Sequence, residues 1–364
     1  MSILIFLGVL FVLILVHEWG HYITAKWTKM RVDEFAIGFP PRLFSVKRGE
    51  TEYSLNALPI GGYVKILGEN GDEAEELTPE DKLRTFSARP KWAQALVLIA
   101  GVTMNVLLAW VILVGLLLGG TSVQVDEATA GTNATLTVLG TAPLSPASVL
   151  PVQAEIVGVS RGEATLSMLT PAALVAFVEA GQGAPVTISY QLPEGPLTTV
   201  TITPEVGIDS TRPDTPLLGL QTGLIEERSY GLGAAVVEGT KQTVGMINAI
   251  TVGLVTLLSQ AIVGQADLSQ VAGPVGIVEH VGKAASFGFD SLLLLTAIIS
   301  LNLAVINLFP IPALDGGRLV FVAIEAITRR PINPVWAGRV NLVGFGLLLL
   351  LMVAVTFSDI MKLL

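Results

Sequence analysis

Long apolar runs separated by polar segments are the dominant pattern along the 364-residue chain. A helix needs about 20 apolar residues to cross the ~30 Å hydrocarbon core of a bilayer. Four runs reach that length, and they predict membrane-spanning helices at 1–27, at 93–120, in the first part of 289–328 and at 338–361. The first run lacks the basic start and the cleavage site of a signal peptide, so we expect it to remain in the chain.

Residues 244–264 form a weaker apolar run that is diluted by Asn, Thr, Ser and Gln. This run is either a fifth span or a helix that lies along the membrane interface. Segment 26–91 carries eleven of the 21 Lys and Arg residues, and segment 311–340 carries four. Both segments face the cytoplasm under the positive-inside rule, which requires an even number of crossings between them. We therefore expect four spans, external chain ends and an interfacial helical segment at 226–288.

The composition agrees with a multi-span membrane protein. Of the residues, 51% are apolar and only 14% are charged, against about a quarter charged in soluble domains. The net charge of −9 leaves no basic surface for a phosphate backbone, so we expect no nucleic-acid partner. Cysteine is absent from the sequence, and any metal must therefore be held by His, Asp or Glu.

Two polar segments have the alternation of β-strands rather than a helical period. Residues 121–225 contain the alternating runs PVTISYQL and LTTVTITP and one short helical pattern, and they predict an external β-rich domain. Residues 28–92 contain a second alternating stretch, 52–68, in which Gly61 and Gly62 predict the turn of a hairpin. A plain cytoplasmic hairpin is one interpretation that the residues leave open for that stretch.

Two of the three histidines stand in the sequence HEWGH at positions 17 to 21, inside the first span. In a helix His17 and His21 share one face, so both imidazoles can reach one ion while Glu18 lies beside it. This is the arrangement of a zinc site with an adjacent general base. A hydrogen-bonded pair of core histidines is the alternative, but each ionisable group inside a span costs about 2.5–3.5 kcal/mol, which favours a functional role.

A catalytic zinc ion usually has three protein ligands, so we expect a third ligand near another break in a span. The third span ends in NLFPIPALDGG, where Pro310 and Pro312 interrupt the helix. Asp315 follows on a glycine-flanked turn, at the depth expected for the two histidines. Together with HEWGH, this position predicts a metal ligand. The alternative is a proline turn in which Asp315 is the N-cap of the next helix.

These two motifs resemble the paired motifs of site-2-protease-type intramembrane zinc metalloproteases, peptidase family M50, most closely the bacterial RseP/RasP-like branch. The stretches DEFAIGFPPRLFSVKRGETEYSLNALPIGGYVKILGE, PKWAQALVLIAGVTMN and AGPVGIVEHVG resemble that branch in the same order. The resemblance implies one Zn²⁺ per chain, held by His17, His21 and Asp315. It implies that Glu18 is the base that activates water. It also implies that the amide of Asn307 holds the substrate backbone or a developing oxyanion.

The same resemblance implies the architecture and the setting. We expect a multi-span α-helical membrane protein with a membrane-associated β-hairpin on the cytoplasmic side and an inserted extracytoplasmic PDZ-like domain. The expected location is the bacterial inner membrane, with the zinc site toward the cytoplasm. The expected partners are the lipid bilayer and single-span membrane proteins such as anti-sigma-factor-like proteins or signal-peptide remnants. The edge of the hairpin is expected to pair with an unwound substrate segment.

Two places depart from the family pattern. Gly101 and Asn105 match a second-span motif that usually reads Gly-Pro-x-x-Asn, but Val102 replaces the proline. The glycines that usually follow Ser145-Pro146-Ala147, and that form the carboxylate-binding loop of the PDZ-like domain, are missing. His280 lies outside all of these motifs, and we interpret it as a surface or packing residue.

Two other functional classes fit part of the pattern. A non-catalytic membrane scaffold or chaperone that presents the PDZ-like domain would not need metal. An ion transporter could also use intramembrane His, Glu and Asp, but the sequence has no repeat with paired broken helices. The sequence therefore favours an intramembrane zinc endopeptidase that performs regulated intramembrane proteolysis.

Overall fold

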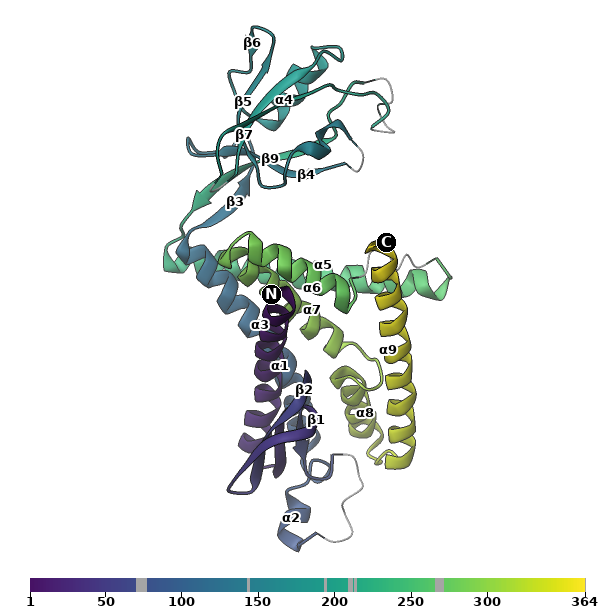
Figure 1. Cartoon of the computed structure of the whole chain (residues 1–364). Coiled ribbons are helices and arrows are strands. Elements are labelled where there is room, and N and C mark those ends of the chain that lie inside the picture. Colours follow the sequence, from purple (N-terminus) through teal and green to yellow (C-terminus); the bar gives the residue numbers. More distant parts are fainter. Residues whose placement is uncertain are drawn as a thin grey trace. The chain divides into compact units, whose positions relative to one another are not determined.

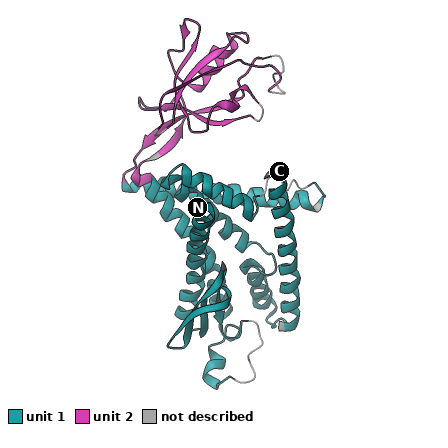
Figure 2. Ribbon diagram, viewed as in Figure 1, with its two compact units in different colours: residues 1–116, 232–364 teal, residues 117–231 magenta. Residues whose placement is uncertain are grey.

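The computed structural model of the chain describes residues 1–69, 77–142, 145–192, 195–208, 212, 215–265 and 272–363. The chain divides into two compact units (Figure 2). Unit 1 comprises Met1–Leu116 and Leu232–Leu364, and unit 2 comprises Leu117–Gly231. Unit 2 is therefore an insertion between the two halves of unit 1.

Unit 1 is built mainly from helices (Figure 1). They are α1 (Ser2–Trp27), α2 (Pro79–Leu83), α3 (Lys91–Gly119), α5 (Leu232–Ile262), α6 (Pro274–Ser286), α7 (Phe289–Leu308), α8 (Asp315–Thr328) and α9 (Pro334–Leu363), together with the strands β1 (Val32–Arg48) and β2 (Thr51–Ile66). Among the described residues, α1, α3, α5, α7 and α9 are long and apolar enough to cross a membrane. The chain is therefore a multi-span membrane protein with an inserted β domain, as the sequence predicts.

Helix α5 contains all but the last two residues of the ambiguous run 244–264. Figure 1 shows α5 running crosswise to α1 and α9. Trp110 of α3 donates a hydrogen bond from Nε1 to Oγ1 of Thr240 at 3.0 Å. Three further residues of α5 pack against a buried cluster from α3 and α7: Met246, Ile247 and Ile250. The crosswise course favours an interfacial helix, and the count of four spans stays a prediction.

The prolines after α7 shape the segment that leads to Asp315. Helix α7 ends at Leu308, two residues before Pro310, which lacks a backbone donor and restricts the preceding residue. Helix α8 begins at Asp315, and its N-cap is Leu314, which makes no side-chain cap bond. The alternative in which Asp315 is the N-cap is therefore wrong. Glycine is required at position 316, because a β-carbon there would overlap the carbonyl oxygens at the end of α7.

Helices α1 and α3 approach closely. At Gly20 of α1, a β-carbon would lie 2.5 Å from the carbonyl oxygen of Ala100 in α3. Helix α3 is continuous from Lys91 to Gly119, so the replacement of the motif proline by Val102 leaves it unbroken. The close approach brings the polar residues of α1 against α3.

Strands β1 and β2 form a sheet of their own. The chain turns between them at Gly49, which has a φ of +66°, and Gly61 and Gly62 lie inside β2. Residues 52–55 and 62–65 pair with the same part of β1 in opposite directions, so the chain also reverses between Asn56 and Gly62, a few residues before the position predicted from the two glycines. Because Ile37 pairs with both Gly62 and Leu55, the first half of β1 lies between the two halves of β2.

The turn between β1 and β2 is joined to α1 by Glu50. Its Oε1 accepts hydrogen bonds from Nζ of Lys26 at 2.6 Å and from Nη2 of Arg84 at 2.8 Å. The Arg84 guanidinium, followed by the Lys26 ammonium, holds the pKa of Glu50 below its usual range. Since the Glu50 side chain is 31% exposed, we expect Glu50→Gln to lower the free energy of unfolding by only about 0.2–1 kcal/mol at neutral pH.

The pH dependence of this effect has a defined sign. The stabilisation from Glu50 is fully present above the ordinary glutamate pKa of about 4.3, and it is lost as pH falls through the lowered pKa of the folded state. The difference in Tm between wild type and Glu50→Gln, followed by circular dichroism, is expected to be largest near neutral pH and to vanish in acid. A constant difference between pH 7 and pH 3 would contradict this account.

Unit 2 is a β-rich domain with one α-helix among its described residues. Its elements are β3 (Thr121–Val125), β4 (Thr135–Thr141), a 3-10 turn η1 (Pro146–Val149), β5 (Glu155–Arg161), β6 (Ala164–Thr165), α4 (Pro171–Glu179), β7 (Val186–Gln191), β8 (Thr198–Ile202) and β9 (Leu220–Arg228). The antiparallel sheet has the order β3-β9-β4-β5-β7-β8, and β6 pairs with β5. Thr170 caps α4, whose buried residues Leu174 and Val178 join the core of the unit.

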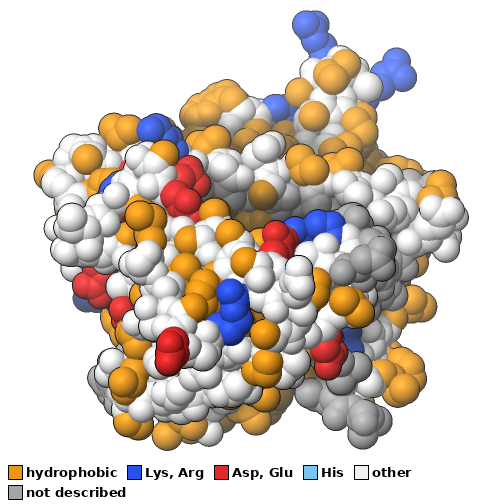
Figure 3. Space-filling model, turned by 90° about the horizontal axis from the view of Figure 1, so that it is seen from above, with side chains coloured by type: hydrophobic (Ala, Val, Ile, Leu, Met, Phe, Trp, Pro, Cys, Tyr) orange, Lys and Arg blue, Asp and Glu red, His pale blue; other side chains and the backbone are white. Residues whose placement is uncertain are grey.

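Charged side chains are scattered over the surface of the molecule that Figure 3 shows. Lys and Arg side chains alternate with Asp and Glu side chains, and no basic patch forms among the described residues on that face. This distribution agrees with the expectation that the protein has no nucleic-acid partner, which stays a prediction.

Candidate metal centre

The metal centre is formed by α1 and the start of α8. His17 and His21 lie one helical turn apart on α1, and their Nε2 atoms are 3.1 Å apart. Oδ2 of Asp315 lies 3.2 Å from Nε2 of His17 and 3.3 Å from Nε2 of His21. The side chains of the three residues are 12%, 10% and 21% exposed, respectively. Three residues from two distant parts of the sequence thus converge on one point in a largely apolar unit.

The three facing atoms fit a metal ion better than a hydrogen-bonded cluster. The Nδ1 of His21 donates to the carbonyl oxygen of Val97 at 2.8 Å, so in a neutral imidazole Nε2 carries a lone pair. Oδ2 of Asp315 is buried and makes no hydrogen bond of good geometry. In a tetrahedral zinc site with ligand bonds of ~2.0–2.2 Å, neighbouring ligand atoms lie about 3.3 Å apart. The observed separations match that spacing, so this donor set fits zinc.

Glu18 lies at the same centre. The residue is half-buried, and its carboxylate interacts electrostatically with His17, His21 and Asp315. Strand β2 passes beside it, since a β-carbon at Gly62 would lie 3.1 Å from Cγ of Glu18. The absence of a side chain at position 62 therefore lets the sheet approach the site.

Two amide side chains reach His17. Nδ2 of Asn307, in the last turn of α7, lies 3.5 Å from Nε2 of His17. Nδ2 of Asn105, on α3, lies 3.3 Å from Nδ1 of the same imidazole. The structure thus brings all five predicted site residues together and adds Asn105. The sequence carried one signal for Asn105, its place in the GVTMN motif, but that motif gave no role for the side chain.

His280 lies apart from this group. It is exposed on α6 and is absent from the one cluster of metal-binding side chains among the described residues. Its interpretation as a surface residue agrees with this position.

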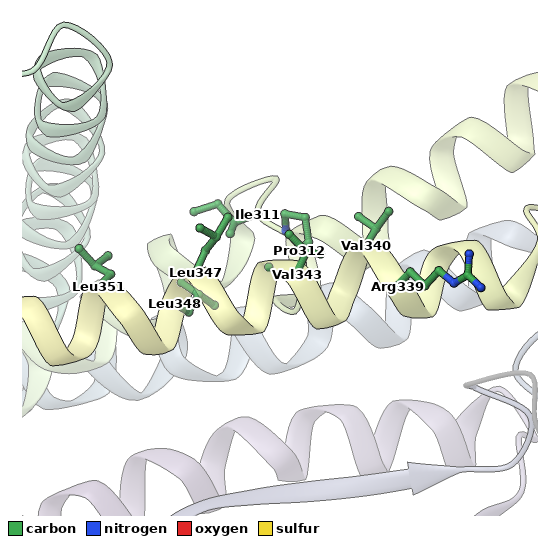
Figure 4. Close-up of a pocket in the computed structure, with 9 residues that line it drawn as sticks. Ile311, Pro312, Arg339, Val340, Val343, Leu347, Leu348 and Leu351 are labelled. Atoms are coloured by element: carbon green, nitrogen blue, oxygen red, sulfur yellow. The ribbon is translucent and has the colours of Figure 1, made fainter.

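A groove of about 370 Å³ lies beside the turn that precedes Asp315 (Figure 4). One wall is formed by Ile311 and Pro312 of that turn, and the other is one face of α9 between Arg339 and Leu351. The lining is almost entirely apolar, with Arg339 at one end (Figure 4). The groove therefore offers a hydrocarbon-like surface beside the turn that leads to Asp315.

Comparison with known proteins gives consistent matches along the whole chain. The family described as "Peptidase family M50" matches residues 5–351. A chain of Clostridium perfringens, whose name includes "zinc metalloprotease", is 36% identical over 355 residues, which cover 96% of this chain and 95% of its own length. Zinc metalloprotease RasP of Oceanobacillus iheyensis is 29% identical over 428 residues, covering 97% of each chain. Zinc metalloprotease RasP of Geobacillus kaustophilus is 29% identical over 441 residues, covering 99% of this chain and 98% of its own length.

Proposed function

The chain belongs to peptidase family M50 and is a zinc metalloprotease, and from this premise we propose that it hydrolyses single-span membrane proteins inside the bilayer. The observation that carries the proposal is the convergence of Nε2 of His17, Nε2 of His21 and a carboxylate oxygen of Asp315. These groups lie between helices that are long and apolar enough to span a membrane. Ionisable groups are costly at such a place and are retained there for function.

His17, His21 and Asp315 would hold the zinc ion. A zinc ion bound there supplies Lewis-acid polarisation of the scissile carbonyl and activates water for attack. The carbonyl of Val97 keeps the proton of His21 on Nδ1 and leaves Nε2 free as a ligand. The carboxylate of Asp315 offsets part of the positive charge in a site that has little contact with water.

Glu18 and Asn307 would carry the remaining steps. Glu18 takes a proton from the attacking water as the water oxygen bonds to the carbonyl carbon, and it then delivers a proton to the leaving nitrogen as the C–N bond breaks. The amide of Asn307, beside Nε2 of His17, donates to the substrate backbone or to the developing oxyanion. Glu18 approaches the metal centre from α1, and Asn307 approaches it from α7.

The substrate must be extended at the cleavage site, because the carbonyl groups of a helix are held in its own hydrogen bonds. Segment 62–66 of β2 pairs with β1, and no second strand pairs with it among the described residues. Its outer edge begins at Gly62, which lies beside Glu18. We assign this edge as the place where an unwound substrate segment adds as a strand.

The setting that we propose has four spans, with α5 along the interface and unit 2 as an extracytoplasmic PDZ-like domain. The crosswise course of α5 and the Lys and Arg residues of segments 26–91 and 311–340 support this topology. The zinc site then faces the cytoplasmic side of the bacterial plasma membrane. Anti-sigma-factor-like proteins or signal-peptide remnants, already shortened by another protease, are the substrates that we propose.

The proposal is tested with the full chain in lipid vesicles that contain a helical single-span reporter. We expect cleavage that stops when zinc is removed by a chelator and returns when zinc is added. A reporter whose span carries a Gly-Pro pair is expected to be cleaved faster than one with an unbroken Leu-rich helix. Stoichiometric zinc without cleavage of either reporter would favour the non-catalytic scaffold, and cleavage that persists without metal would contradict the mechanism.

A further inference from the structure

Helix α3 presents three positions, spaced by four residues, to the histidine pair. Val97, Gly101 and Asn105 lie on one face of the helix because four residues make about one turn. The carbonyl of Val97 accepts the hydrogen bond from Nδ1 of His21 at 2.8 Å. At Gly101 a β-carbon would overlap Nε2 of His21 and lie 2.8 Å from Cε1 of His17. The small residue in the middle therefore lets both rings lie directly against α3.

Asn105 is the third position, and its side chain is incompletely paired. The residue is fully buried, and its Oδ1 has no hydrogen-bond partner. Its Nδ2 lies 3.3 Å from Nδ1 of His17. If the amide nitrogen donated to Nδ1, the proton of a neutral His17 would sit on Nε2, and Nε2 could not bind a metal ion.

Rotation of the amide resolves this conflict. The oxygen and nitrogen of a carboxamide exchange places when χ2 turns by about 180°, and the two orientations have nearly the same shape. After the exchange, Oδ1 faces Nδ1 of His17 and accepts a hydrogen bond from its N–H. Nε2 of His17 is then free to bind metal, as Nε2 of His21 is through the carbonyl of Val97.

We propose that Asn105 is a positioning residue that fixes the orientation and the tautomer of His17 through a hydrogen bond from Nδ1 to Oδ1. One helix, α3, then orients both histidines, by a backbone carbonyl for His21 and by a side-chain amide for His17. Ser300 of α7 donates from Oγ to the backbone carbonyl of Asn105 at 2.8 Å, a contact with the backbone and not with the side-chain amide. The inference rests on the proposed zinc site.

The test compares three variants of the full chain by competition for zinc with a chromophoric chelator. Asn105→Leu keeps the volume and removes the acceptor, and we expect zinc affinity to fall about 10- to 100-fold. Asn105→Asp keeps an acceptor oxygen and is expected to bind zinc within a few-fold of wild type. Ser300→Ala loses the bond to the backbone of Asn105 but touches neither histidine, and it is expected to bind zinc like wild type.

The Tm of the metal-free proteins separates positioning from folding. We expect Asn105→Leu and Ser300→Ala to have similar Tm values without metal, so that only the zinc affinity distinguishes them. Wild-type affinity in Asn105→Leu, or no recovery of affinity in Asn105→Asp, would overturn the role of Asn105. A wild-type protein that binds no zinc would instead overturn the proposed metal site, so the two failures are distinguishable.

Discussion

Replacement of Glu18 by Gln is expected to lower the rate of reporter cleavage by about 10²- to 10⁴-fold while zinc stays bound. Glutamine has nearly the same shape as glutamate but cannot accept a proton from water. Asp315 is the other carboxylate at the metal centre, but its oxygen faces both histidines as a metal ligand. It is therefore not expected to replace Glu18 as the base. The loss is therefore expected in the rate of the chemical step, measured by single-turnover cleavage in vesicles.

The control is the same substitution at Glu163, an exposed residue of unit 2. Glu163→Gln is expected to cleave the reporter like wild type. Equal cleavage by Glu18→Gln and wild type, with one zinc ion in each, would remove Glu18 from the role of base. Loss of zinc from Glu18→Gln would show that Glu18 helps to hold the metal.

Replacement of Asp315 by Asn is expected to weaken zinc binding by more than about 100-fold. Mutation of a residue that only supports a ligand lowers metal affinity by about 10- to 100-fold, and loss of a ligand itself is expected to cost more. The amide is a poor ligand and carries no charge, so two neutral imidazoles alone would face a divalent cation in a buried site. Cleavage is expected to disappear together with zinc. Elemental analysis of the purified protein measures the bound metal, and chelator competition measures the affinity.

The matched control for this prediction is Asp290→Asn. Asp290 is exposed in the first turn of α7, outside the metal centre. This variant is expected to keep full zinc content and cleavage. If Asp315→Asn kept wild-type zinc affinity but lost cleavage, Asp315 would act on the substrate rather than on the metal.

The metal centre could be predicted from sequence because its signals are local. His17 and His21 share a helical face whatever the rest of the chain does, since the spacing of four residues is fixed by the helix. Pro310 fixes the end of α7 for an equally local reason, the missing backbone donor. The pairing of these two segments rested on the matching membrane depth of Asp315 and the two histidines and on the need for a third ligand, and the family resemblance implied the same ligand set.

The hairpin shows where local signals fail. The pair Gly61-Gly62 signals a reversal that the structure completes just before Gly62, but the alternation does not predict the further turn at Gly49. It also does not predict that the first half of β1 lies between the two halves of β2, an arrangement that depends on strand pairing. The pairing register of β1 and β2 is set by the whole sheet and by the approach of Gly62 to Glu18. The alternation of apolar and polar residues along the chain does not encode either of these.

The contacts that orient the histidines could not be predicted from the sequence for a related reason. Val97 acts through its backbone carbonyl, and a carbonyl has the same chemistry in every residue type. Asn105 is polar in an apolar span, which was a usable signal, but its contact with His17 depends on how α1 and α3 pack. The close approach at Gly20 and Gly101 creates that packing.

Diffraction from crystals of the full chain at the zinc absorption edge tests the central claim most directly. We predict one anomalous peak about 2.0–2.2 Å from Nε2 of His17, Nε2 of His21 and a carboxylate oxygen of Asp315. A zinc peak bound by other residues, or zinc-loaded crystals without a peak between these three side chains, would contradict the account.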